Sequence, residues 1–153
     1  MCIVKLYRRT NMEIIQTSTQ KEAIQALLLS EKLPVDDLPA SLENFFTMVD
    51  NEELIGVAGL EIYGSYGLLR SLVVLPSYRG LGIAGKLIGQ IESLAKTKGL
   101  AALFLLTETA PEYFAGKGFQ QISREDVPEA VKASSEFSHV CPVSAIVMKK
   151  SID

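Results

Sequence analysis

The sequence has few of the residues that build metal, redox or disulfide sites. It contains no tryptophan, one histidine and two cysteines, Cys2 and Cys141, which lie at opposite ends of the chain. Because neither cysteine belongs to a Cys-x-x-Cys pair, no disulfide framework and no zinc site is indicated. Histidine-based chemistry would have to use His139, so we expect a reaction that needs no metal.

Long apolar runs and clusters of one charge sign are also lacking. No run approaches the roughly 18 residues that a spanning helix needs, and the first ten residues lack the apolar core of a signal peptide. The net charge of -3 and the pI near 5.3 give no general attraction to nucleic acid or to anionic lipid. We expect a cytoplasmic protein with a small-molecule partner and with neither a nucleic acid nor a membrane partner, and a homodimer is left open.

The length and hydrophobicity of the chain fit one compact domain. With 153 residues and 48% hydrophobic content, it can bury a sizeable core. We expect a loosely ordered extension over residues 1–11 and a single domain over 12–153. Period-two and continuous apolar patterns predict strands over 13–18, 45–50, 53–63 and 66–75, the last three consecutive and antiparallel.

The second half of the chain begins with a strongly periodic helix. Apolar residues at helical spacing predict a helix from Gly80 to Gly99, followed by a buried strand over 101–106. Such a strand, helix and strand unit crosses right-handed and makes its two strands parallel. The remaining elements expected are a helix over 111–117, a strand over 119–123, a helix over 128–132 and a strand over 143–150. The fold class is therefore mixed α/β, with a mostly antiparallel sheet.

Three glycines precede the periodic helix. Gly80, Gly82 and Gly85 form a G-x-G-x-x-G pattern. Glycines let the backbone approach a ligand closely, and the first N–H groups of a helix attract anions, so the loop suits a pyrophosphate. The alternative is a tight turn between a strand and a helix, because the pattern alone is weak evidence.

The surroundings of the glycines argue against the commoner nucleotide sites. In the dinucleotide fingerprint the strand runs directly into the first glycine, whereas residues 76–79 intervene here. The acidic residue that should end the next strand is missing, since the first acid is Glu108. No Gly-Lys-Ser/Thr follows, which excludes a Walker loop. A phosphate-binding loop after an antiparallel meander remains.

The stretch RGLGIA resembles the Q/R-x-x-G-x-G/A motif of the GNAT superfamily of N-acetyltransferases, and LVVLPSY before it is similar to that family's strand and loop. The resemblance covers about residues 12 to 150. It implies the GNAT fold, a central mixed sheet flanked by helices, and acetyl-CoA as cosubstrate. The residues it implies for cofactor binding are Leu72, Val73 and Val74 along the pantetheine, and Arg79, Gly80, Leu81, Gly82, Ile83, Ala84 and Gly85 on the pyrophosphate.

A second landmark of the family is Asn-x-x-Ala-x-x-aliphatic-Tyr before Gly-Phe. The stretch TETAPEYFAGKGF aligns Thr107 with the Asn and Phe114 with the Tyr, both beside the cofactor. That tyrosine is the family's usual general acid, and Phe114 cannot donate a proton. Tyr113 is adjacent, but one helical step turns it by about 100°, which favours another face. A non-catalytic acyl-CoA-binding or regulatory domain is therefore the alternative.

Three stretches, LLRSLVV, TETAPEYF and EFSHVCPVSAIVMKK, resemble the arsenic-resistance-associated N-acetyltransferases and, more distantly, the acetyltransferase domain of N-acetylglutamate synthase. This narrower resemblance implies direct acetyl transfer to an amino acid or a related small amine.

Two carboxylates are candidates for the general base. Glu61 interrupts an otherwise apolar strand, and Glu108 lies next to the expected acetyl end of the site. Each also has a structural interpretation, as a solvent-facing strand residue and as an acid favouring a helix N-terminus.

The acceptor is expected to contact Arg70, Ser71 and Cys141. A lone arginine in an apolar strand suits a bidentate grip on a substrate carboxylate. A salt bridge at the strand face explains Arg70 equally well.

Overall fold

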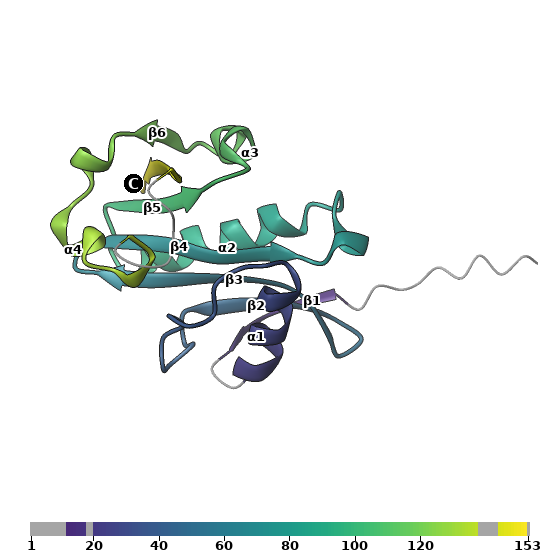
Figure 1. Cartoon of the computed structure of the whole chain (residues 1–153). Coiled ribbons are helices and arrows are strands. Elements are labelled where there is room, and N and C mark those ends of the chain that lie inside the picture. Colours follow the sequence, from purple (N-terminus) through teal and green to yellow (C-terminus); the bar gives the residue numbers. More distant parts are fainter. Residues whose placement is uncertain (1–11, 18–19, 138–143, 153) are drawn as a thin grey trace, which may run out of the picture.

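The structure, a computed structural model, describes residues 12–17, 20–137 and 144–152 and arranges them as one twisted sheet with helices on both faces (Figure 1). The predicted extension over residues 1–11 lies outside the described residues. None of the described helices combines the length and hydropathy needed to cross a bilayer. The elements are β1 (Met12–Thr17), α1 (Lys21–Ser30), β2 (Phe45–Asp50), β3 (Glu53–Tyr63), β4 (Tyr66–Val74), α2 (Ile83–Thr97), β5 (Ala102–Thr107), α3 (Pro111–Gly116), β6 (Gln120–Ile122), α4 (Glu129–Lys132) and β7 (Ile146–Ser151).

The described strands follow the order β1-β2-β3-β4-β5-β7-β6 in the sheet. Neighbouring strands are antiparallel except β4 and β5, which are parallel and are joined by α2. The predicted mixed, mostly antiparallel sheet is therefore confirmed, as is the parallel pair. Strands β2 and β3 have the ends that the sequence pattern predicted.

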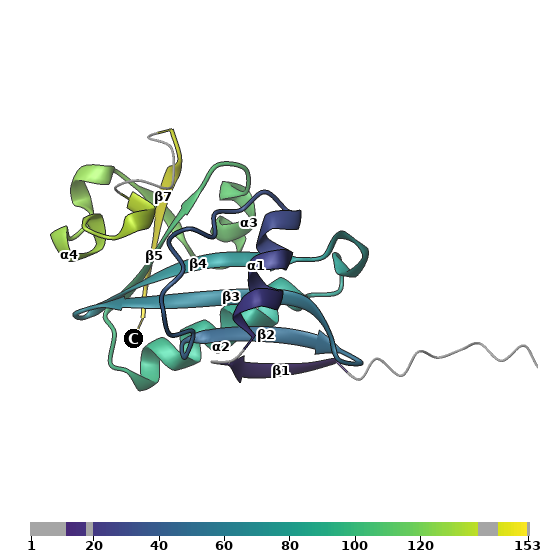
Figure 2. The same cartoon turned by 60° about the horizontal axis from the view of Figure 1, so that its bottom comes forward.

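Helices α1 and α2 cover opposite faces of the sheet (Figure 2). The apolar stripe of α2, which includes Ile83, Leu87 and Ile91, is buried against β2, β3 and β4. On the other face, Ile24 and Leu28 of α1 are fully buried and belong to the second core cluster. Because β3 and β4 have a core on each face, both strands are apolar along most of their length.

A β-bulge in β4 prepares the site. Ser71 and Leu72 together lie opposite Ala58, because Arg70 pairs with Gly59 while Val73 pairs with Val57. Ser71 has a φ of 57°, which is uncommon for a residue other than glycine. Because of the extra residue, the side chains of β4 beyond the bulge point to the opposite faces of the sheet from those that regular pairing would give them.

Strands β4 and β5 separate shortly before this bulge. Their parallel pairing covers only residues 66–68 against 102–104. Beyond that point β5 continues to Thr107 beside β7, while β4 runs toward the glycine loop. The two strands therefore leave a space between their carboxyl ends.

Candidate functional site

A pocket of about 920 Å³ opens where β4 and β5 separate. Its walls are residues 69–74 of β4, residues 105–107 of β5, the segment 31–34 after α1 and the start of α2. The predicted cofactor residues that line it are Leu72, Val73, Val74, Arg79, Gly80, Gly82, Ile83, Ala84, Thr107 and Phe114. Leu81 and Gly85 do not belong to the lining, and Leu81 is exposed at the loop tip. The fold thus brings together residues far apart in the sequence.

The glycine loop presents unshielded N–H groups at one end of the pocket. Gly80 and Gly82 have φ values of 81° and 78°, a region that L side chains rarely adopt. Gly82 is the N-cap of α2, and no side chain caps this 15-residue helix. The first N–H groups of α2 therefore point outward with the positive end of the helix dipole, an arrangement that suits an anion.

The loop is fixed to the sheet by its side chains. The Arg79 Nε donates a hydrogen bond to the Val74 carbonyl oxygen at 3.1 Å, and its Nη2 lies 3.2 Å from a Glu31 carboxylate oxygen. The Tyr78 hydroxyl donates to Asp50 at the end of β2 at 2.8 Å. The Arg79 side chain therefore ties the loop to β4 and α1, a positioning role that the motif did not reveal.

At the opposite end, Arg70 is surrounded by the protein's own acceptors. Its guanidinium makes two bonds of 2.9 Å to the Asp37 carboxylate and one of 2.7 Å to Glu61, and its Nε donates to Ser71 Oγ at 3.1 Å. Glu136 lies 3.4 Å from Nη2. Burial alone would lower the pKa of Arg70. The hydrogen bonds to the carboxylates outweigh this effect, so the pKa is raised above its usual value and the group stays charged. All three guanidinium nitrogens are engaged, which favours the salt-bridge interpretation over a grip on a substrate carboxylate.

The predicted base Glu61 points into the same ion-pair cluster. It accepts hydrogen bonds from Arg70 and from the Tyr63 hydroxyl, the latter at 2.8 Å, and it does not belong to the pocket lining. Burial, together with the bond to Glu61, raises the pKa of Tyr63. The other predicted base, Glu108, is exposed and does line the pocket. Cys141 and His139 lie outside the described residues.

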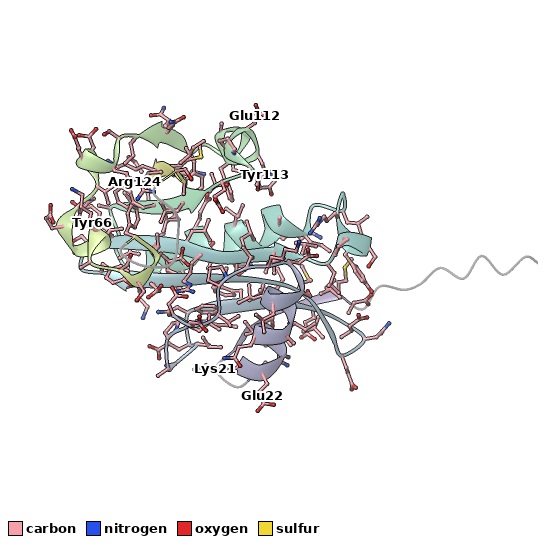
Figure 3. The ribbon with its side chains drawn as sticks, in the orientation of Figure 1. Lys21, Glu22, Tyr66, Glu112, Tyr113 and Arg124 are labelled. Carbon is pink, nitrogen blue, oxygen red and sulfur yellow. The ribbon has the colours of Figure 1, made fainter. Side chains whose placement is uncertain are left out.

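Helix α3 places two aromatic rings over the pocket. Both Tyr113 and Phe114 belong to its lining, although Phe114 packs against the core and Tyr113 is exposed. Their ring centroids are 5.3 Å apart with an edge-on geometry. Figure 3 shows Tyr113 on the side of α3 that faces α2, while Glu112 points away. Thr107 Oγ accepts a hydrogen bond from the Ala110 N–H at 3.1 Å and so stabilises the start of α3.

Together, the fold and the site define an α/β domain with a helix N-terminus that no side chain caps at one end of an elongated pocket and a carboxylate cluster at the other. No group of three or more potential metal ligands occurs within the described ranges. The sequence profile described as "Acetyltransferase (GNAT) family" matches residues 5–119, and the chain belongs to this family.

Individual relatives agree with this assignment. The chain is 27% identical over 131 residues to an amino-acid acetyltransferase of Ralstonia nicotianae, an alignment that covers 78% of this chain and 29% of that protein. It is 36% identical over 89 residues to one of Ectopseudomonas mendocina, covering 56% of this chain and 20% of the relative. The chain therefore spans less than a third of these curated relatives.

Among solved structures, N-acetylglutamate synthase of Neisseria gonorrhoeae, in complex with coenzyme A and N-acetyl-glutamate, superposes with a TM-score of 0.78. The match covers 93% of this chain and 35% of that one, at 23% identity. At this level of identity the similarity establishes the common fold.

Proposed function

We propose that the protein is an acetyl-CoA-dependent N-acetyltransferase that transfers the acetyl group directly to the amine of an amino acid or amino-acid analogue. One observation carries the proposal: a single pocket joins the uncapped N-terminus of α2 to the gap between β4 and β5 and to a cluster of carboxylates. A ligand with phosphates at one end and a reactive group at the other fits this arrangement.

The residues present fit coenzyme A. The positive φ values of Gly80 and Gly82 suit the close approach of a pyrophosphate to the backbone, and the stretch 72–74 of β4, which lines the pocket, suits a pantetheine chain along its backbone. When bound, acetyl-CoA supplies the acetyl group as a thioester. The backbone at the Ser71 bulge, which is free of β5, offers N–H donors to a carbonyl oxygen, the kind of donor that stabilises an oxyanion.

The acceptor class follows from the relatives. The curated proteins that match this chain are named amino-acid acetyltransferases, and the structural neighbour from Neisseria gonorrhoeae was solved with N-acetyl-glutamate. These names support an amino acid, or an analogue with a free α-amine, as the acceptor for this chain.

Tyr113 takes the proton-donor role that Phe114 cannot fill. Its ring lines the pocket beside Phe114, and it belongs to the same short helix. Burial raises the pKa of Tyr113, so its hydroxyl stays protonated at neutral pH and can donate to a departing thiolate.

Release of free thiol from acetyl-CoA, measured across a panel of amino acids and glutamate analogues that includes arsenical and phosphinic compounds, tests the proposal. We expect turnover with at least one α-amine acceptor and none with its N-methylated or N-acetylated form. Tight binding of acetyl-CoA without turnover on any acceptor would instead support the non-catalytic acyl-CoA-binding alternative.

A further inference from the structure

The carboxylate best placed to meet the acceptor is one that the sequence did not point to. Of the three acids on Arg70, only Glu136 belongs to the pocket lining. Glu31 also lines the pocket, but it pairs with Arg79 at the glycine-loop end. Glu108 lines it too, but its side chain is exposed.

Glu136 combines burial with access to the pocket. Its side chain is 11% exposed, and its distance of 3.4 Å from Arg70 Nη2 is longer than the distances of 2.9 and 2.7 Å to Asp37 and Glu61. Asp37 and Glu61 therefore hold Arg70 more closely, while Glu136 is the acid of the three that belongs to the pocket lining.

The charge balance at this end of the pocket favours a cation. Counted over the four described residues Asp37, Glu61, Arg70 and Glu136, one guanidinium lies within 4 Å of three carboxylates, so this cluster carries more negative than positive charge in a largely buried setting. Coulombic interactions strengthen as the surroundings become less polar, so a positive group entering the pocket would be attracted to the cluster. The ammonium group of the acceptor is such a group.

The segment that carries Glu136 is held to the fold on both sides of it. Ser134 is buried, and its Oγ accepts a hydrogen bond from the Phe137 N–H at 3.4 Å. The Phe137 ring lies 5.8 Å from the Arg124 guanidinium and packs against the hydrophobic cluster that includes Val131 of α4. Glu136 therefore has a defined position at the pocket wall.

We propose that Glu136 binds the ammonium group of the acceptor and accepts its proton, an inference that rests on the proposed acetyltransferase function. The proton moves from the ammonium to the Glu136 carboxylate, and the neutral nitrogen forms the N–C bond to the acetyl carbonyl carbon as the C–S bond breaks. The departing thiolate takes a proton from Tyr113, and the second proton that the nitrogen loses restores the Tyr113 hydroxyl. The remaining proton leaves Glu136 for solvent as the products depart, so charge and protons balance. Arg70 acts through Glu136 as a positioning residue.

The test replaces each candidate carboxylate by its amide. Glu136→Gln should lower kcat/KM for the acceptor by about 100-fold or more, the usual contribution of a general base, while the affinity for acetyl-CoA changes less than about twofold. Calorimetry should also show weaker acceptor binding to the protein saturated with coenzyme A. Glu129→Gln, at an exposed acid of α4, is the matched control and should behave as wild type.

Glu61→Gln distinguishes a catalytic role of these carboxylates from a structural one. It removes one carboxylate that pairs with the same guanidinium, but Glu61 does not belong to the pocket lining. It should lower the melting temperature at least as much as Glu136→Gln but affect the acceptor kcat/KM far less. An acceptor-specific loss in Glu61→Gln or Glu108→Gln, with Glu136→Gln near wild type, would overturn the inference and leave the acetyltransferase function standing. A wild-type protein that binds acetyl-CoA but acetylates nothing would overturn both.

Discussion

The two ends of the pocket are built in different ways. The glycine-loop end uses backbone groups from one continuous stretch, with Gly80 and Gly82 at positive φ and the N-terminus of α2 behind them. The other end uses side chains from four separate segments, gathered on Arg70. Asp37 and Arg70, for example, are 33 residues apart in the sequence.

This difference predicts different sensitivities at the two ends. A site made of backbone N–H groups tolerates many side-chain changes but not a change of backbone conformation or of local charge. A buried ion-pair cluster depends on each of its members, because removing one leaves the others uncompensated. Substitutions at the Arg70 end should therefore act first on stability, and substitutions at the loop should act first on ligand affinity.

The largest effect is expected for Arg70→Met. The side chain is 1% exposed, and its loss leaves three carboxylates close together without a cation. We expect the free energy of unfolding at neutral pH to fall by about 3–5 kcal/mol, measured by urea denaturation.

Arg79→Met is the control for Arg70→Met at the other end of the pocket. Its side chain is 55% exposed and its ion pair is open to solvent, so the loss of stability should stay below about 1 kcal/mol. Equal losses in the two variants would remove the distinction between the ends.

The next effect concerns affinity at the glycine loop. Gly82→Asp forces a non-glycine residue to a φ of 78° and places a negative charge at the N-terminus of α2. Strain and repulsion of about 2–3 kcal/mol together should weaken acetyl-CoA binding by about 30- to 150-fold in a calorimetric titration. Gly89→Asp adds the same charge at an open position further along α2 and should bind nearly as well as wild type. Undiminished affinity in Gly82→Asp would contradict the assignment of the loop.

The contrast between the two ends also explains what the sequence could reveal. The loop is local, so its glycines follow from spacing, as does the parallel pair β4 and β5, while residues 72–74 follow from the resemblance to the family. For the lone Arg70 in an apolar strand, the sequence left a substrate carboxylate and a salt bridge as alternatives. The partners of Arg70 could not be named, because Asp37 and Glu136 come from segments that only the tertiary fold brings to β4.

Tyr113 shows how little a correct local rule says about the lining of a pocket. One helical step does turn the side chain by about 100°, but α3 has only six residues and lies over the mouth of a wide pocket. Both residues therefore belong to the lining, although Tyr113 is exposed and Phe114 packs against the core. The bulge at Ser71 could not be predicted from the residues of β4 alone, because a bulge depends on how the strand pairs with its partner β3.

Tyr113→Phe should have a moderate effect on the reaction and almost none on the fold. Thiols ionise near pH 8.5, so a thiolate can leave without full protonation, and we expect kcat to fall by about tenfold. KM for acetyl-CoA should change little, because the ring remains. Tyr66→Phe, where the ring packs edge-on against Phe104, is the control. If Tyr113→Phe kept the full kcat, the proton would have to come from another donor such as Thr107 or water.

The smallest effect is expected for Lys117→Gln, beside the glycine loop. The Lys117 Nζ lies 3.0 Å from the place where a Cβ of Gly85 would be and 5.6 Å from the Tyr113 ring centroid, which puts a cation next to the first turn of α2. Because this group is exposed, its attraction for a phosphate should weaken binding of coenzyme A by only about two- to fivefold when lost.

Salt gives the Lys117 prediction its sharpest form. At 1 M ionic strength the Debye length is about 3 Å, so Lys117→Gln and the wild type should bind coenzyme A equally well. Lys96→Gln, in the last turn of α2, removes the same charge at the far end of the helix and should change affinity at neither salt concentration. A difference between Lys117→Gln and wild type that persists at high salt would mean that Lys117 acts through its packing on Tyr113 and not through its charge.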